Sequence, residues 1–204
     1  LLDDVRRDMA LLDASELGTD HLLEFSTTWD AEAIVPLYLD GNPHPLGQRQ
    51  ALRDAGDGSD WSDAHRRHHG TLRAFQEQRG YYDLFLINPA GDVVYTVAKE
   101  ADFGTNLTNG PYADSGLGEV FRRARDLSAG QVIFADYAAY APSAGAPAAF
   151  AASPMFDEDG RRIGVVAAQL GAERLAEALS FAGAESGLTV FLTGADGILR
   201  TELA

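Results

Sequence analysis

The stretch of sequence from residue 81 to residue 170 decides the fold. It opens with YYDLFLINPAGDVVYTVAK (81–99) and closes with FAASPMFDEDGRRIGVVAAQL (150–170). In each of these segments, two β-rich apolar runs flank a short loop that contains a glycine, Gly91 or Gly160, which can adopt the positive φ of a tight hairpin. The stretch is therefore predicted to form two β-hairpins of one antiparallel sheet, with a helical insert between them.

A third segment, LTVFLTGADGILRT (188–201), repeats the pattern of the first hairpin. Its Phe-Leu pair and its Gly197 align with the Phe-Leu pair and Gly91 of the first hairpin. Such internal repetition predicts that the chain begins a second, related module near residue 183. Chance recurrence is the alternative, because strand-loop-strand units are common.

Length and composition limit the classes of protein to be considered. The chain has 204 residues, of which 46% are hydrophobic, and this suffices for one core or for one core and part of another. Sixteen Lys and Arg stand against 31 Asp and Glu, and the net charge of −15 would repel a phosphate backbone, so nucleic acid is not predicted as a partner. The sequence has no cysteine, which excludes disulfide and thiol chemistry. It contains neither a run of about 20 apolar residues nor a signal-peptide pattern, and we expect it to be a piece of a longer protein.

The region before the sheet is predicted to be helical. From Leu1 to Tyr38 apolar residues recur at helical spacing among acidic ones, which predicts one long amphipathic helix or two helices. Residues 40–60 are predicted to be loop, because proline fixes φ and disfavours helix in the residue before it. A further helix is predicted over 62–78, ending at Gly80.

Five strands and two more helices complete the predicted module. A helix at 115–126 is expected before the third strand and a short one at 172–181 after the fifth. Because consecutive hairpins do not make a parallel sheet, the fold class is predicted to be α+β with an antiparallel sheet. The predicted strands are 82–88, 92–99, 131–140, 148–156 and 162–170.

Two runs within this module, YYDLFLINPAGDVVYT to LGEVFRRA (81–124) and FADYAAYAPSAGAPAAF to VVAAQL (134–170), resemble the double Cache (PAS-like) sensory ectodomains of bacterial transmembrane receptors. Such receptors are histidine kinases, chemoreceptors and nucleotide cyclases. The resemblance covers about residues 60–204 and implies an extracytoplasmic location, a parent protein anchored in the membrane, and a small-molecule ligand that signals through stalk helices. It implies three parts: an N-terminal helical stalk and loop (1–60), a membrane-distal PAS-like module (61–182), and the start of a membrane-proximal module (183–204).

The sequence departs from the pattern of this family at two places. Family members that bind amino acids carry an Arg-x-Trp-Tyr run after the second strand and an Asp that ends the last strand. The corresponding positions here read Thr105-Asn106-Leu107 to Tyr112, and Gln169. The usual clamps for the ammonium and carboxylate groups of an amino acid are therefore not expected.

In a PAS-like module the ligand lies between the concave face of the sheet and the helix and loop that cross it, so the resemblance assigns the pocket to residues 99–113 and the last three strands. Pockets for small solutes combine aromatic walls with a few convergent polar groups. Three of the aromatic residues could instead be core, Asn106 could serve turn formation, and Lys99 with Asp102 could be a solvated ion pair. The predicted ligand-binding residues are Tyr95, Lys99, Asp102, Asn106, Tyr112, Phe134, Asp136, Tyr140, Phe150 and Gln169.

Other motifs predict no further chemistry. His65, His68 and His69 have a spacing that can place two imidazoles on one metal ion, but no HExxH pattern accompanies them and two arginines lie between them, so a solvated helix face is favoured. The sequence has no nucleophile elbow, phosphate-binding loop or cysteine nucleophile. Neither enzymatic activity, nor a metal, nor a cofactor is predicted for it.

Three functional hypotheses follow. The first is an extracytoplasmic sensor of a small solute that forms a homodimer through its N-terminal helix, although the apolar positions of that helix could instead pack on the sheet of the same chain. The second is an ectodomain without a small-molecule ligand, switched by a periplasmic partner protein. A cytosolic PAS-type module that holds a cofactor is disfavoured, since the chain has no cysteine for a flavin adduct and no histidine in the sheet region for haem.

Overall fold

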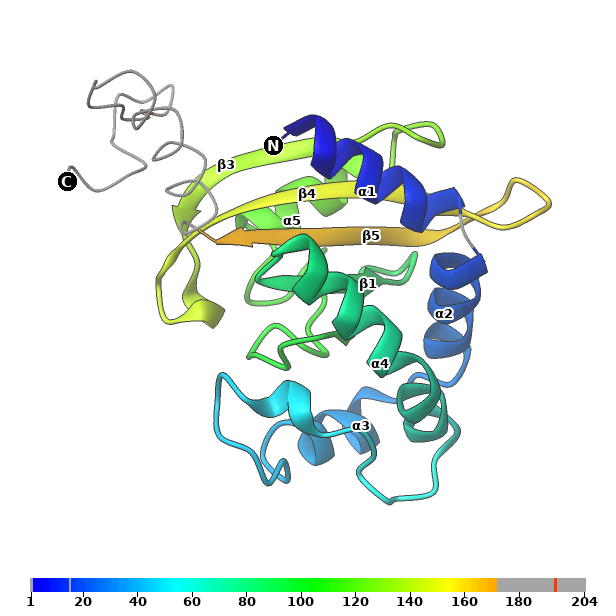
Figure 1. Ribbon diagram of the computed structural model, residues 1–204, viewed down its shortest axis with the longest axis vertical. Helices are drawn as coiled ribbons and strands as arrows, with labels where there is room; N and C mark the ends of the chain where they lie inside the picture. Colours follow the sequence, from blue (N-terminus) through cyan, green and yellow to red (C-terminus); the bar gives the residue numbers. More distant parts are fainter. Residues whose placement is uncertain (1, 15, 172–192, 194–204) are drawn as a thin grey trace.

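The chain folds as a five-stranded antiparallel sheet with helices on both faces (Figure 1). The computed structural model describes residues 2–14, 16–171 and 193. All neighbouring strands are antiparallel, in the order β2-β1-β5-β4-β3. The predicted α+β class and PAS-like five-stranded sheet are thus confirmed. The strands are β1 (Asp83–Ile87), β2 (Val93–Thr96), β3 (Ile133–Ala139), β4 (Pro147–Phe156) and β5 (Arg162–Gly171).

Both predicted hairpins are present. In the β1–β2 hairpin, Gly91 has a φ of 99°, and a side chain there would meet the Thr108 hydroxyl oxygen at 2.7 Å, so conformation and space both require glycine. In the β4–β5 hairpin, Gly160 has a φ of 74°. The hairpin predicted at 188–201 and the helix predicted at 172–181 lie outside the described residues, apart from Thr193.

The structure divides the predicted long N-terminal helix into three: α1 (Leu2–Ala14), α2 (Glu16–Thr27) and α3 (Ala31–Tyr38). The last break occurs at Asp30, whose extended backbone and side chain cap α3 by accepting from the backbone N–H groups of Glu32 and Ala33. An N-cap residue cannot also lie within a continuing helix. The chain therefore turns between α2 and α3. Helices α1 and α2 also run in different directions (Figure 1).

Two further helices, α4 and α5, cover opposite faces of the sheet. Helix α4 (Asp60–Arg79) begins at its N-cap Ser59 and ends at Gly80, which has a φ of 66°, as predicted. Helix α5 (Gly116–Ala124) packs on the opposite face from α1, α2 and α4 (Figure 1). We call these faces the α5 face and the α1 face. Short 3-10 helices, η1 (Arg49–Ala51) and η2 (Ala141–Ser143), lie in the connections.

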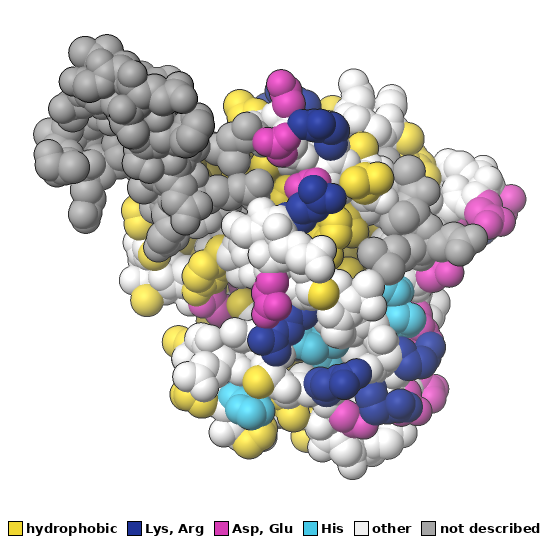
Figure 2. Space-filling view, in the orientation of Figure 1, with side chains coloured by type: hydrophobic (Ala, Val, Ile, Leu, Met, Phe, Trp, Pro, Cys, Tyr) yellow, Lys and Arg dark blue, Asp and Glu magenta, His cyan; other side chains and the backbone are white. Residues whose placement is uncertain are grey.

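The apolar stripe of α1 is buried in its own chain. Val5, Met9 and Leu12 are at most 2% exposed and join the core of the α1 face, whereas Leu2 and Leu11 are 51% and 54% exposed. The outer surfaces of α1 and α4 carry acidic and basic side chains side by side (Figure 2). Of the helices that the structure describes, none combines the length and the apolar character needed to cross a membrane.

Candidate functional site: a buried polar cluster

Polar side chains gather where several strands begin or end. The start of β1, the end of β5, the loop that follows β2 and the 3-10 helix η2 meet at one end of the sheet, on the left in Figure 1. Seven of the polar side chains there are at most 7% exposed. Burial of this many polar groups is costly unless they are paired. We call this set the polar cluster: Asp83, Lys99, Glu100, Asp102, Tyr140, Ser143 and Gln169.

Strand pairing places two members of the cluster next to each other. Asp83 in β1 pairs in register with Gln169 in β5. Asp83 and Gln169 stand two residues from Phe85 and Ala167, which belong to the α5-face core, so their side chains point to that face. One oxygen of Asp83, Oδ1, accepts three backbone N–H groups, those of Leu84 (2.7 Å), Val97 (2.8 Å) and Ala98 (3.0 Å). These bonds turn the chain away after Thr96, and this explains why β2 ends earlier than predicted.

Lys99 is a buried cation with a constrained backbone. Its φ of 56° is unusual for a residue with a side chain, and the residue is 1% exposed. The ammonium lies 4.3 Å from the ring centroid of Tyr95 and 5.3 Å from that of Phe103, and it donates to the carbonyl oxygen of Thr96. Burial lowers the pKa of Lys99 to about 7, against the opposing effect of the Asp83 charge.

A chain of hydrogen bonds links the remaining members. Gln169 Nε2 donates to Ser143 Oγ at 3.0 Å, and Ser143 Oγ donates to Glu100 Oε2 at 2.7 Å. Separately, the Tyr140 hydroxyl donates to Asp102 Oδ2 at 2.7 Å. Burial and the neighbouring carboxylates raise the pKa of Tyr140, so it stays a donor. The network joins η2 to the loop after β2 and to the end of β5.

Three buried oxygens of the cluster have no hydrogen-bond partner: Asp83 Oδ2, Asp102 Oδ1 and Gln169 Oε1. An unpaired buried acceptor costs about 1–3 kcal/mol. Burial, reinforced by the charge of Asp102, raises the pKa of Asp83 to about 8, and burial raises the pKa of Asp102 to about 7. The cluster therefore has unused capacity to accept hydrogen bonds, which protons or a donor-bearing small molecule can fill.

Four of the predicted ligand-binding residues, Lys99, Asp102, Tyr140 and Gln169, come together in this cluster. Two more lie beside it on the α5 face. Phe150 pairs in register with Gln169, and its ring centroid is 4.8 Å from that of Tyr140. The half-buried Tyr112 has its ring centroid 6.3 Å from the same Tyr140 ring. These aromatic rings form an apolar wall next to the polar groups.

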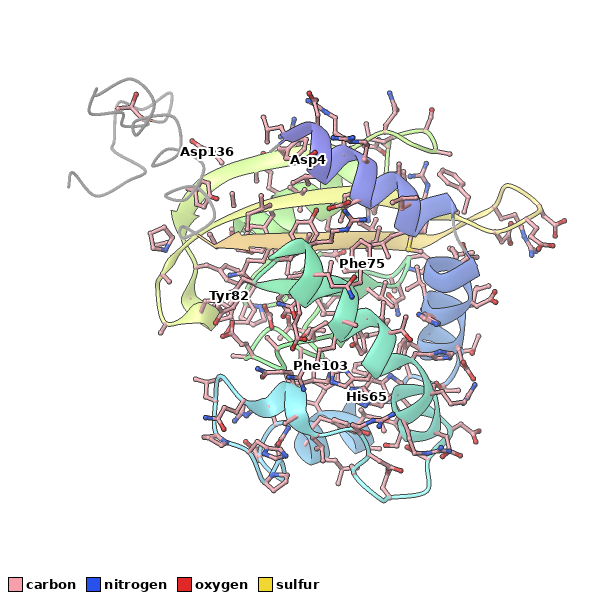
Figure 3. The ribbon with its side chains drawn as sticks, viewed as in Figure 1. Asp4, His65, Phe75, Tyr82, Phe103 and Asp136 are labelled. Atoms are coloured by element: carbon pink, nitrogen blue, oxygen red, sulfur yellow. The ribbon has the colours of Figure 1, made fainter. Side chains whose placement is uncertain are left out.

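The other four predicted residues are not members of the polar cluster, although the ring of Tyr95 contacts Lys99. Tyr95 faces α4, where its hydroxyl bonds His69 at 2.8 Å. Asn106 serves the β1–β2 turn, as its amide donates to Asp92 at 2.8 Å. Phe134 packs with the α1-face core, and Asp136 is exposed on β3 (Figure 3). The bulge in β3, between Ala135 and Ala138, shifts the register there.

Sequence reasoning missed Asp83, Glu100 and Ser143. The sequence could have pointed to Asp83, because it is a charged residue at a core position of the otherwise apolar strand DLFLI. No sequence pattern indicated Glu100 or Ser143. The expected solvated face of α4 is also corrected, since His65 and His69 are 0% and 1% exposed. Among the described residues, no group of three His, Asp or Glu side chains is placed to hold a metal ion.

Comparison with known proteins gives matches to solved structures only. No protein-family model matches the chain, and no curated protein matches it. The sensory domain of the Campylobacter jejuni chemoreceptor Tlp3 is 13% identical with a TM-score of 0.48, and the match covers 97% of this chain and 71% of that one. An extracellular ligand-binding receptor from Desulfohalobium retbaense is 14% identical with a TM-score of 0.49, covering 93% and 32%.

A third solved structure is the ligand-binding domain of the Pseudomonas aeruginosa amino acid chemoreceptor PctC in complex with GABA. It is 18% identical with a TM-score of 0.45, and the match covers 84% of this chain and 69% of that one. The chain thus spans between about a third and about seven tenths of these structures. All three are sensory or ligand-binding domains of receptors rather than catalytic domains, the class that the sequence resembles, and the likeness concerns the fold alone.

Proposed function

We propose that the chain is the extracytoplasmic ligand-binding sensor domain of a bacterial transmembrane receptor, and that the polar cluster binds a small solute. The observation that carries the proposal is the group of three unpaired, buried oxygens on Asp83, Asp102 and Gln169. Native proteins rarely leave such acceptors unpaired. A solute with donor groups would satisfy them, with Tyr112, Tyr140 and Phe150 as its apolar wall.

A solute bound at the polar cluster would contact several elements of the fold at once. Asp83 belongs to β1, Asp102 to the loop after β2, and Gln169 to β5. A solute that bonds all three favours one arrangement of that loop over others. For signalling, the solute must bind one conformation better than another, by about 1–3 kcal/mol for ordinary coupling.

The proposal also covers the domain organisation, membrane anchoring and dimerisation of the parent protein. We place residues 1–60 as the stalk and loop, residues 61–182 as the membrane-distal module and residues 183–204 as the start of a second module, in a receptor anchored in the membrane. A homodimer through α1 would have to use the exposed Leu2 and Leu11, because the main apolar stripe of α1 already packs on its own sheet. Sedimentation of the wild-type chain and of Leu11→Asp tests this interface.

A thermal-shift screen against small metabolites tests the sensor function. A ligand at a hundredfold excess over its Kd stabilises the native state by about 2.7 kcal/mol, which raises the melting temperature by several degrees. A hit should lose most of its shift in Asp102→Asn and keep it in Asp136→Asn, a matched exposed control. A hit that survives in Asp102→Asn and in Gln169→Leu would place the ligand elsewhere. No hit with the folded chain would favour the ectodomain switched by a partner protein.

A further inference from the structure

Four histidines meet where α4 packs against α2 and against residues 49–55. Their rings form two close pairs: the centroids of His21 and His68 are 3.9 Å apart, and those of His65 and His69 are 4.3 Å apart. Figure 3 shows His65 on α4, close to α3 and to the connection that holds η1. We call these four residues the histidine cluster. They take no part in the polar cluster.

Hydrogen bonds of the imidazoles connect α4 to the neighbouring segments. His65 Nδ1 bonds the carbonyl oxygen of Arg53 at 2.9 Å, and His69 Nε2 bonds that of Gln50 at 2.7 Å. Both bonds need a donating N–H, and His69 Nδ1 is then free to accept the Tyr95 hydroxyl at 2.8 Å. His68 Nε2 contacts the Glu24 carboxylate of α2. The neutral form of His69 therefore satisfies all of its bonds.

Burial and surrounding charge make added protons costly. His65, His69 and His21 are 0%, 1% and 6% exposed. The charged groups near His65 and His69 are cationic: Lys99 from the loop after β2, Arg53 from the connection, and Arg73 from α4 itself. On the α2 side, the Glu24 carboxylate faces the His21 and His68 pair, and Arg67 already binds it. The other ionisable groups in contact are the phenols of Tyr38 and Tyr95.

We propose that the histidine cluster is an acid-sensitive switch, in which the neutral imidazoles of the buried His21, His65 and His69 help to hold α4 against α2 and residues 49–55, and their protonation releases α4. The inference goes beyond the proposed function and does not depend on ligand binding. It rests on two ring pairs with centroids 3.9 and 4.3 Å apart, in which two protonated members would repel each other at close range.

The direction of the titration agrees with this geometry. Burial, helped by His68, lowers the pKa of His21 to about 4, and burial lowers the pKa of His69 to about 3 and that of His65 well below its usual value. Because these pKa values are depressed in the closed state, closure is most stable above about pH 6.5 and is lost as pH falls below it. For one histidine with a pKa of about 4 closed and 6.5 open, the closed-to-open ratio falls about 30-fold at pH 5.

Release of α4 would also affect the polar cluster. The Tyr95 hydroxyl bonds His69, and the Tyr95 ring lies 4.3 Å below the Lys99 ammonium. Protonation of His69 removes the acceptor for that hydroxyl and adds a positive charge near the Lys99 ammonium. The histidine cluster and Lys99 are thus linked through one side chain.

Amide hydrogen exchange on the full 204-residue chain at pH 7.5 and pH 5.0, corrected for intrinsic exchange rates, tests the switch. Amides of α4 and of residues 49–55 should open at least about 30-fold more readily at pH 5.0, while β4 and β5 stay protected. His21→Phe keeps a ring of similar size without a titrating group and should weaken the effect. His44→Gln, outside the cluster, should leave it unchanged.

Equal protection of α4 at the two pH values would overturn the proposal, as would an acid effect of the same size in His21→Phe and the wild type. If His21→Phe does not fold, His68→Gln replaces it, and the wild type supplies a direct readout. Imidazole resonances of His21 and His69 should titrate below pH 5, together with loss of protection in α4. Titration near pH 6.5 with α4 still protected would also overturn the proposal.

Discussion

The hydroxyl of Tyr140 donates a 2.7 Å hydrogen bond to Oδ2 of Asp102, while the other oxygen of the same carboxyl group, Oδ1, is buried without a partner. The bond stabilises the charged form of Asp102 and so opposes burial, which raises its pKa to about 7. This half-satisfied carboxyl group joins the end of β3 to the loop after β2. A ligand that completes its hydrogen bonds would strengthen that connection.

Removing the hydroxyl should cost stability. Tyr140→Phe removes the hydrogen bond to Asp102 Oδ2, and we expect the free energy of unfolding to fall by about 1–3 kcal/mol. Urea denaturation at pH 7.5 measures it. Tyr112→Phe, in the adjacent half-buried ring, is the matched control and should change stability by less than about 0.5 kcal/mol. Equal losses in the two variants would mean that the Tyr140 bond contributes nothing specific.

The raised pKa of Asp102 predicts how stability depends on pH. Because the folded state binds this proton more tightly than the unfolded state, whose pKa is near 3.8, the contribution is full below about pH 4 and is lost as pH rises through 7. Asp102→Asn cannot ionise, so its stability relative to the wild type should rise by about 2–3 kcal/mol between pH 5 and pH 8.

Guanidinium denaturation of the wild type, Asp102→Asn and Asp136→Asn at both pH values measures this difference. Asp136 is exposed, so its variant should follow the wild type. Parallel pH curves for all three proteins would show that Asp102 ionises in the folded state as it does in the unfolded chain. That result would also remove the argument for an unsatisfied site at this residue.

One glycine of β5 is required by close packing. Gly164 has a φ of 152°, and a Cβ there would lie 2.3 Å from the carbonyl oxygen of Ile87. Gly164→Ala should therefore destabilise the fold by about 2–4 kcal/mol. Gly160→Ala, in the β4–β5 turn with nothing within 4 Å, should cost only about 1 kcal/mol of backbone strain. Melting curves that rank the two variants in the opposite order would contradict the packing of β5 on β1.

The elements that local sequence determines were predictable. Both hairpins follow from glycines at positive φ between apolar runs, and α4 ends at Gly80 as its sequence indicates. The break at Asp30 was missed, because helical spacing of apolar residues continues across it and outweighs one capping residue in a sequence window.

The candidate site was only partly predictable. Lys99, Asp102, Tyr140 and Gln169 followed from the resemblance, which places a pocket near their segments. The histidines could not be assigned from their spacing, because it puts His65 and His69 on one side of α4 without saying what covers that side. The covering residues, in α2 and at 49–55, are distant in sequence, and periodicity carries no information on such contacts.

Lys99 is the single lysine of the chain, so its burial can be tested by amine chemistry. With burial lowering its pKa to about 7, the folded amine is mostly neutral at pH 9, and only lack of access limits its reaction. Acylation of Lys99 in the native chain at pH 9 should be at least about 100-fold slower than in 8 M urea, since it needs local opening. Peptide mass spectrometry gives both rates, and a ligand that fills the polar cluster should slow the native rate further. A native rate close to the rate in urea would mean that the ammonium reaches solvent, and the polar cluster would then lose its central cation.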